Sequence, residues 1–104
     1  MKPAHAIALT ALALLAACAP ESEHAATLEA AYDKIVPEQA VVCREKQIEI
    51  RRFVLCENML WLVEGDRYYA VNGSARPWVE RFGYGFFEYQ IPVDFDIKAI
   101  TDQF

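Results

Sequence analysis

Reactive side chains are few in this chain of 104 residues, which has three cysteines and two histidines. His24 lies in a short segment of small and polar residues, 18–26, which we expect to form a flexible tether. A general base must be held within hydrogen-bond reach of its target, and a tethered histidine is not held. The sequence therefore argues against Ser–His or Cys–His catalysis and against a histidine-bearing zinc site. We predict no catalytic residue, no metal site and no cofactor.

Two aspartates offer an alternative chemistry. If residues 93–97 form a strand, Asp94 and Asp96 project from one side of it, about 7 Å apart. A cation site or a glycosidase-like carboxylate pair fits that spacing, and so does an ordinary solvated strand face. Catalytic carboxylates usually come from separate elements that line a cleft, so the solvated face is the preferred interpretation.

The N-terminal residues have the pattern of a secretory signal. Lys2 provides a positive tip, and residues 6–17 form an apolar stretch that ends in small residues. The stretch is too short to cross a membrane, which takes about 20 residues. Its last residues and the one that follows, Leu15-Ala16-Ala17-Cys18, resemble the lipobox of bacterial lipoproteins.

The lipobox resemblance implies a location and a modification. Residues 1–17 would be removed as a signal peptide, and Cys18 would carry diacylglycerol and an N-terminal acyl chain, which together anchor the protein stably. The following residue is Ala19 and not Asp, which in Gram-negative members of this class implies the outer membrane, facing the periplasm. The alternative is an ordinary secretory signal cut near Ala16 or Ala19.

The remaining cysteines, Cys43 and Cys56, form an even pair in a compartment that permits disulfides. They are not spaced as Cys-x-x-Cys. A small domain gains stability from such a bridge, about 3 kcal/mol for a loop of this length. We therefore predict a structural disulfide, with two free buried thiols or a reactive pair as the alternatives.

Aromatic residues are concentrated between Trp61 and Tyr89. Large rings fill the core of a small domain, but rings close to arginines also anchor protein interfaces. Within this region the candidate partner-binding residues are Arg76, Trp78, Arg81, Tyr84 and Phe86. We expect most rings to be buried and Tyr84, which lies between two glycines, to be exposed.

The pattern of the mature chain predicts one small domain, residues 27–104. Leu28, Ala31, Tyr32 and Ile35 share one helical face, with Thr27 as the N-cap and Pro37 beyond the end. Strand character follows in residues 39–43 and 48–56, with a break at Arg51-Arg52. Residues 59–63 and 67–71 form the clearest predicted hairpin, around a Glu-Gly-Asp turn.

A second helix is predicted after Ser74 as its cap, with Pro77 in the first turn and Gly83 at the end. Residues 86–91 and 93–97 alternate as strands hinged at Pro92, although residues 97–104 also fit a helical turn. The expected fold is α+β: a small antiparallel sheet with two short helices on one face and one disulfide.

The net charge of −5 argues against nucleic-acid binding. Together these features predict a non-enzymatic, outer-membrane-anchored lipoprotein that binds another envelope protein. One alternative is an inhibitor of a secreted cell-wall hydrolase of the lysozyme type, because such targets are often cationic. A less favoured one is a small metal-binding envelope protein.

Overall fold

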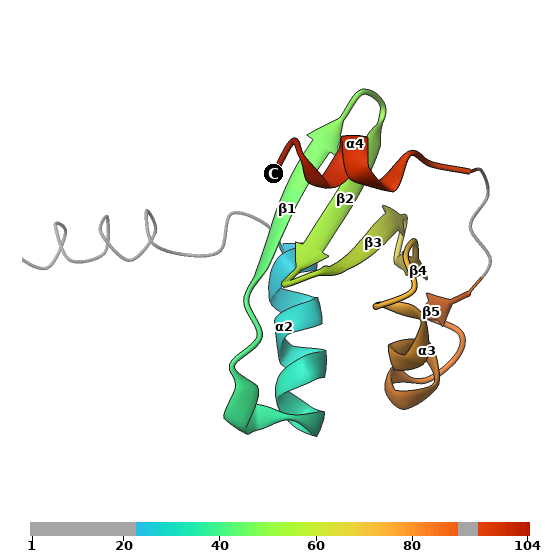
Figure 1. Ribbon diagram of the computed structural model, residues 1–104. Helices are drawn as coiled ribbons and strands as arrows, with labels where there is room; N and C mark the ends of the chain where they lie inside the picture. The colour runs from blue at the N-terminus through green and yellow to red at the C-terminus, as the bar shows by residue number, and fades with distance from the viewer. Residues whose placement is uncertain (1–22, 90–93) are drawn as a thin grey trace, which may run out of the picture.

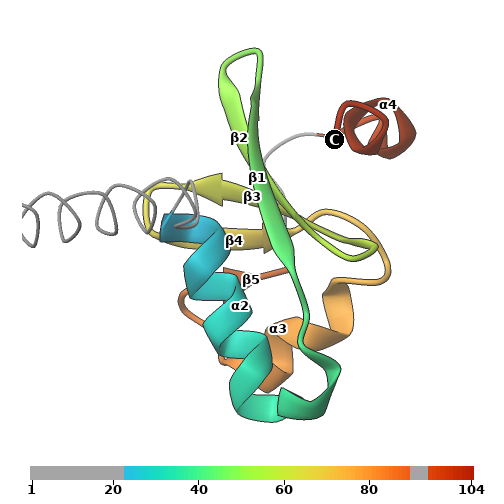
Figure 2. The ribbon, with the colours of Figure 1, turned by 90° about the vertical axis from the view of Figure 1, so that its left-hand side faces the viewer.

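A computed structural model describes residues 23–89 and 94–104 of the chain (Figure 1). Within these residues a five-stranded sheet has the order β1-β2-β3-β4-β5. Helices α2 and α3 cover one face of the sheet, and helix α4 lies against the opposite face (Figures 1 and 2). The expected small α+β fold is confirmed, with a third helix on the second face.

Helix α2 spans Glu23–Ile35 and begins four residues before the predicted cap. Residues 23–26, which we expected in the tether, are therefore helical. Ala25 extends the apolar face of Leu28 and Tyr32 and is buried with them, which explains the earlier start. The Thr27 hydroxyl donates to the Glu23 carbonyl inside the helix, so Thr27 is not a cap. Residues 1–22, including Cys18, lie outside the described residues.

Strands β1 (Cys43–Ile48) and β2 (Arg51–Cys56) form a hairpin whose turn is at Glu49 and Ile50. The predicted strand 39–43 is wrong, because residues 37–39 form a 3₁₀ turn and β1 begins at Cys43. The predicted strand 48–56 is confirmed over Arg51–Cys56 as β2, but the chain reverses at Glu49 and Ile50, just before the predicted break at Arg51-Arg52. The sequence did not predict strand β1, because this edge strand has mostly charged and polar side chains and little alternation of apolar with polar residues. Its register places Cys43 opposite Cys56, and the predicted disulfide between them is confirmed.

The predicted central hairpin is confirmed as β3 (Met59–Glu64) and β4 (Arg67–Ala70). Strand β3 is buried on both faces of the sheet. Met59, Trp61 and Val63 pack under α2 and α3, whereas Leu60 and Leu62 pack toward α4. This two-sided burial explains why the sequence of β3 is continuously apolar.

Helix α3 spans Arg76–Phe82 and ends at Gly83, as predicted. The predicted Ser74 cap is wrong, because the Asn72 side chain accepts the hydrogen bond from the Ala75 backbone N–H. Gly83 has a φ of 111°, which glycine adopts without strain, and its N–H donates to the Val79 carbonyl.

After α3 the chain adds a short fifth strand, β5 (Phe87–Glu88), parallel to β4. The expectation of a purely antiparallel sheet is corrected here, because α3 carries the chain back to the end of the sheet at which β4 began. The predicted strand 93–97 is also wrong where it is described, since α4 occupies Ile97–Thr101. Residues 90–93 lie outside the described residues.

Candidate functional site

Helix α3 and the link to β5 carry the five residues that the sequence singled out: Arg76, Trp78, Arg81, Tyr84 and Phe86. We call them the aromatic–arginine surface. Tyr84 is 62% exposed and Phe86 is 60% exposed. Gly83 and Gly85, on either side of Tyr84, have φ values of 111° and 108°. These two glycine conformations turn the chain so that the Tyr84 side chain faces solvent.

The two arginines of this surface are held over aromatic rings. The Arg81 guanidinium carbon lies 4.4 Å from the centroid of the Trp78 ring, and that of Arg76 lies 5.2 Å from the centroid of the Tyr89 ring. Cation–π contacts of this kind fix the side chains while their N–H groups remain available to a ligand. The arginines are therefore partly ordered before any partner binds.

Tyr89 lies beneath the exposed link and joins it to α3. Its ring packs edge-on against Tyr84 at 5.7 Å, and its hydroxyl donates to Glu80 Oε2 at 2.7 Å. Two contacts raise the pKa of Tyr89. The polar contact with Tyr84 has the larger effect, and the hydrogen bond to Glu80 has the next largest. The phenol therefore stays protonated, and keeps its hydrogen bond to Glu80, to a higher pH than an ordinary tyrosine would.

Trp78 differs from the rest of the surface because it is half-buried. Its ring packs edge-on against Tyr32 of α2, with the ring centroids 4.8 Å apart. The exposed part of the surface thus consists of Arg76, Arg81, Tyr84 and Phe86, and Trp78 belongs partly to the core.

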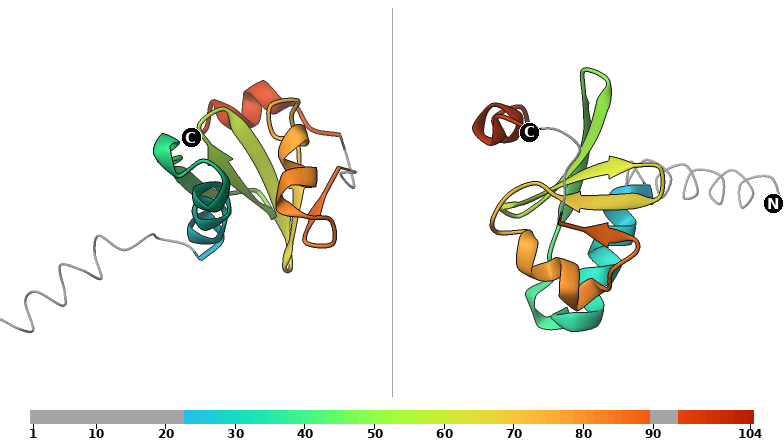
Figure 3. Two further views of the ribbon diagram at one scale, coloured as in Figure 1. Left: turned by 90° about the horizontal axis from the view of Figure 1, so that it is seen from below. Right: turned by 90° about the vertical axis from the view of Figure 1, so that its right-hand side faces the viewer.

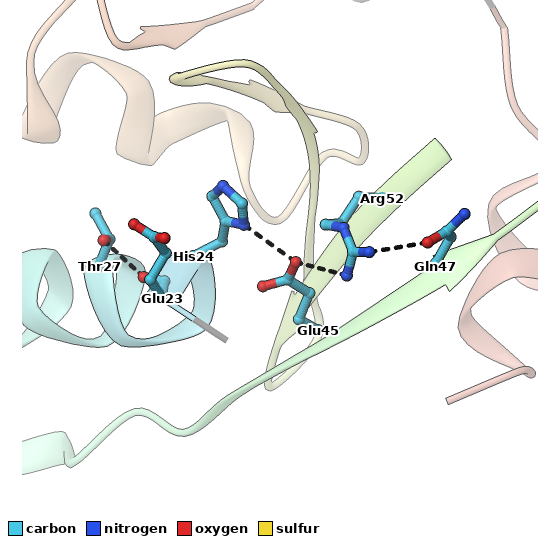
Figure 4. Close-up of polar contacts among 6 residues, drawn as sticks. All are labelled: Glu23, His24, Thr27, Glu45, Gln47 and Arg52. Carbon is cyan, nitrogen blue, oxygen red and sulfur yellow. Dashed lines mark hydrogen bonds and ion pairs between the residues drawn. The ribbon is translucent and has the colours of Figure 1, made fainter. Parts of the chain in front are cut away.

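A polar cluster of His24, Glu45, Arg52 and Gln47 joins the start of α2 to the β1–β2 hairpin (Figure 4). Glu45 Oε2 lies 3.1 Å from His24 Nδ1 and 2.9 Å from an Arg52 nitrogen, and the Glu45 side chain is only 3% exposed. Arg52 also donates to Gln47 Oε1 at 2.9 Å. The cluster fastens the first turn of α2 to the sheet.

The position of His24 removes the reason that we gave against histidine chemistry, because His24 is held and not tethered. Its carboxylate partner resembles the orienting acid of a catalytic pair. Within the part of the chain that the structure describes, however, the contacts of His24 are with Glu45 and the Tyr68 ring, and not with a hydroxyl or thiol nucleophile. The arrangement is that of a structural contact that joins α2 to β1.

Sequence reasoning missed this cluster because His24 is 21 positions from Glu45 and because the turn of the β1–β2 hairpin was not located from the sequence. The register pairs Glu45 with Val54, which makes Arg52 a diagonal neighbour on the same face of the hairpin. That relation becomes visible only once the turn at Glu49 and Ile50 is known.

The two aspartates considered for a cation site do not share a strand face. Asp96 is the N-cap of α4, where its side chain accepts from the Ala99 backbone N–H, and Asp94 is exposed. Among residues 23–89 and 94–104, no three His, Cys, Asp or Glu side chains are grouped closely enough to hold a metal ion.

Comparison of the chain with protein-family models, curated proteins and solved structures finds no match. Among the described residues, none of the helices has the length and apolar character needed to span a membrane.

Proposed function

We propose that this protein is a lipid-anchored component of the bacterial cell envelope that binds another envelope protein, without catalysis, through its aromatic–arginine surface. The lipobox-like residues Leu15–Cys18 support the anchor. In this proposal the acyl chains on Cys18 hold the protein in the outer membrane, and the domain faces the periplasm.

One observation carries the binding role. Two large aromatic side chains, Tyr84 and Phe86, are each at least 60% exposed on one short link, whereas the other Phe, Tyr and Trp rings among the described residues are buried or half-buried. Exposed aromatic residues beside ordered arginines have the composition of an interface centre. The energy gained on binding comes from burying these rings and pairing the guanidinium groups of Arg76 and Arg81.

The proposed anchor keeps the domain close to the membrane. Five Cα–Cα steps separate Cys18 from Glu23, and a chain of that length reaches at most about 18 Å. The His24–Glu45–Arg52 contacts then fasten the end of α2 from which this short link leaves. A partner would therefore be a protein of the same membrane or one that lies close to it.

Site-directed crosslinking tests the binding role. A photo-crosslinking residue at Pro77, which is exposed on α3 beside the surface, should trap one dominant protein in intact cells that make this protein, and Tyr84→Ala with Phe86→Ala should abolish the product. Ile50→Ala is the matched control, because Ile50 is 88% exposed at the tip of the β1–β2 hairpin. An unchanged product in the double variant would contradict the proposal.

Lipidation is tested separately by mass spectrometry of the N-terminal peptide. The expected species begins at Cys18 and carries acyl chains, and Cys18→Ala should release the protein from the membrane fraction. An unmodified N-terminus near Ala16 or Ala19 would favour the ordinary secretory signal.

A cationic cell-wall hydrolase remains the alternative partner, and the net charge of −5 favours it. A lysozyme assay with the purified domain distinguishes the two proposals. Inhibition that depends on Tyr84 and Phe86 would identify the hydrolase as the target.

A further inference from the structure

Helices α2 and α3 lie on the same face of the sheet (Figure 3). A groove lies between them, lined by residues of α2, α3 and β5. Ala30, Ala31 and Ile35 of α2 form one wall, while Phe82 of α3 and Phe87 of β5 form the other. We call it the α2–α3 groove. Its volume is about 460 Å³, which is within the range of small-molecule sites.

The groove is open because α2 places small side chains on this side. Tyr32 fills the space deeper between the helices, where its ring centroid lies 4.8 Å from that of Phe82. Ala30 and Ala31 above it are too short to reach α3. The result is an apolar depression that the chain's own side chains leave unfilled.

Two cations line the same groove, Lys34 of α2 and Arg81 of α3. Within the described residues neither forms an ion pair with a carboxylate. Arg81 is also held in place by its contact with the Trp78 ring. In an acidic chain, two cations without carboxylate partners beside an apolar surface are complementary to a ligand with an apolar body and an anionic head.

We propose that the α2–α3 groove binds a single-chain anionic amphiphile, with its apolar chain along Ala30, Ala31 and Phe87 and its carboxylate or phosphate head between Lys34 and Arg81. Burial of the chain supplies affinity, and the two cations select the charge of the head. The groove shares Arg81 with the aromatic–arginine surface, but Tyr84 and Phe86 do not line it, so variants at those two residues test the two proposals separately.

Isothermal titration calorimetry tests the proposal on the full chain carrying Cys18→Ser, which cannot be acylated at that position. Dodecanoate and dodecyl phosphate are the probes, each below its critical micelle concentration, and their relative affinities distinguish the two head groups. Saturable one-to-one binding of at least one is expected. Dodecylammonium and dodecyl maltoside should bind at least about tenfold more weakly, because they lack the anionic head.

Variants locate the site. Lys34→Gln with Arg81→Gln should weaken binding about tenfold or more, and Ala30→Trp should abolish it by filling the groove. Lys46→Gln and Asp33→Trp are the matched controls, since both positions are exposed and neither lines the groove. Circular dichroism establishes that each variant is folded.

Three results would overturn the proposal: no saturable binding of either anion, equal binding of dodecylammonium, or binding that survives Ala30→Trp in a folded protein. The Tyr84→Ala, Phe86→Ala variant should bind the anions normally. A failure of this proposal is therefore distinct from a failure of the proposed protein partner, which that double variant tests.

Discussion

Tyr32 shows how one residue organises the interior. Its hydroxyl donates to Met59 Sδ at 3.1 Å and accepts from Trp61 Nε1 at 3.1 Å, so the polar atoms of two buried rings satisfy each other. Its ring, which belongs to α2, packs edge-on against the rings of Trp78 and Phe82 of α3. The same side chain therefore supports the aromatic–arginine surface through Trp78, and it packs against Phe82, which lines the α2–α3 groove.

Removal of the Tyr32 hydroxyl should destabilise the domain. Tyr32→Phe leaves the Trp61 indole N–H buried without an acceptor, which costs about 1–3 kcal/mol of unfolding free energy. Urea unfolding followed by circular dichroism measures the loss. Tyr89→Phe is the control, because its hydrogen bond to Glu80 is exposed and should contribute about 0.5 kcal/mol or less. Equal losses in both variants would contradict this account.

Buried tyrosines also predict how stability depends on pH. Burial raises the pKa of Tyr32 and of Tyr68 above the ordinary value of 10.0. Above about pH 10 the unfolded chain loses these protons first, so stability is complete below that pH and falls as the pH rises, by up to about 1.4 kcal/mol per pH unit for each group.

Urea unfolding at several pH values between about 9 and 11 checks this dependence. Tyr32→Phe should reduce the slope, because one titrating group is lost. A slope equal to that of the unmodified protein would show that Tyr32 ionises without unfolding.

At the scale of elements, the β1–β2 hairpin is fixed by a covalent and an ionic contact. The disulfide joins Cys43 to Cys56, 13 positions apart, at the open end of the hairpin. Glu45 then joins β1 to α2 through His24 and to β2 through Arg52. The edge strand β1 is thus held on both sides, although its own side chains are mostly polar.

Loss of the disulfide should lower stability substantially. Cys43→Ala with Cys56→Ala removes the constraint on the unfolded chain, which for this loop length corresponds to about 3 kcal/mol. The thermal midpoint, measured with and without a reductant, checks the effect. The reductant should lower the midpoint of the unmodified protein and leave that of the double variant unchanged.

The contacts of Glu45 with His24 and Arg52 should reduce fraying of the first turn of α2. We expect Glu45→Ala to increase amide hydrogen exchange in residues 23–27, because the first turn of the helix loses its connection to the sheet. Glu64→Ala is the control, since its pair with Arg51 lies at the surface, with the Glu64 side chain 43% exposed. Unchanged exchange in residues 23–27 would show that apolar packing by Ala25 and Leu28 holds the turn.

At the scale of the whole molecule, the sheet must be covered on both faces. Helices α2 and α3 cover one face, and α4 covers Phe53, Leu55 and Leu62 on the other through Ile100 (Figure 2). Helix α4 spans only five residues. Packing and not intrinsic helix propensity therefore holds it in place.

Disruption of the α4 contact should expose the second face. Ile100→Asp places a charge where the side chain is 6% exposed, so we expect α4 to detach and the protein to bind a hydrophobic dye and aggregate. Ile97→Asp is the control, because Ile97 is 36% exposed, and it should bind dye no more than the unmodified protein. Equal dye binding by both variants would contradict the role of α4.

Local patterns in the sequence were sufficient to predict several helices and strands and the exposure of part of the aromatic–arginine surface. The β3–β4 hairpin follows from two apolar runs around a Glu-Gly-Asp turn, and the end of α3 follows from Gly83. The exposure of Tyr84 follows from its two glycine neighbours. The disulfide pairing was also predictable, because only two cysteines follow Cys18. Each of these features depends either on residues close together in the chain or on the number of cysteines.

Tertiary structure alone decided the remaining features. Trp78 is half-buried because Tyr32 of another helix meets it, and His24 is held because Glu45 lies across from it on β1. The sequence left open a strand over 93–97 and a helical turn over 97–104, and the structure has a helix at Ile97–Thr101, where Ile100 covers the second face of β2 and β3. Local propensity differs by fractions of a kcal/mol per residue, whereas burial of one large apolar side chain contributes about 1.5–3 kcal/mol. Packing therefore prevails wherever the two conflict.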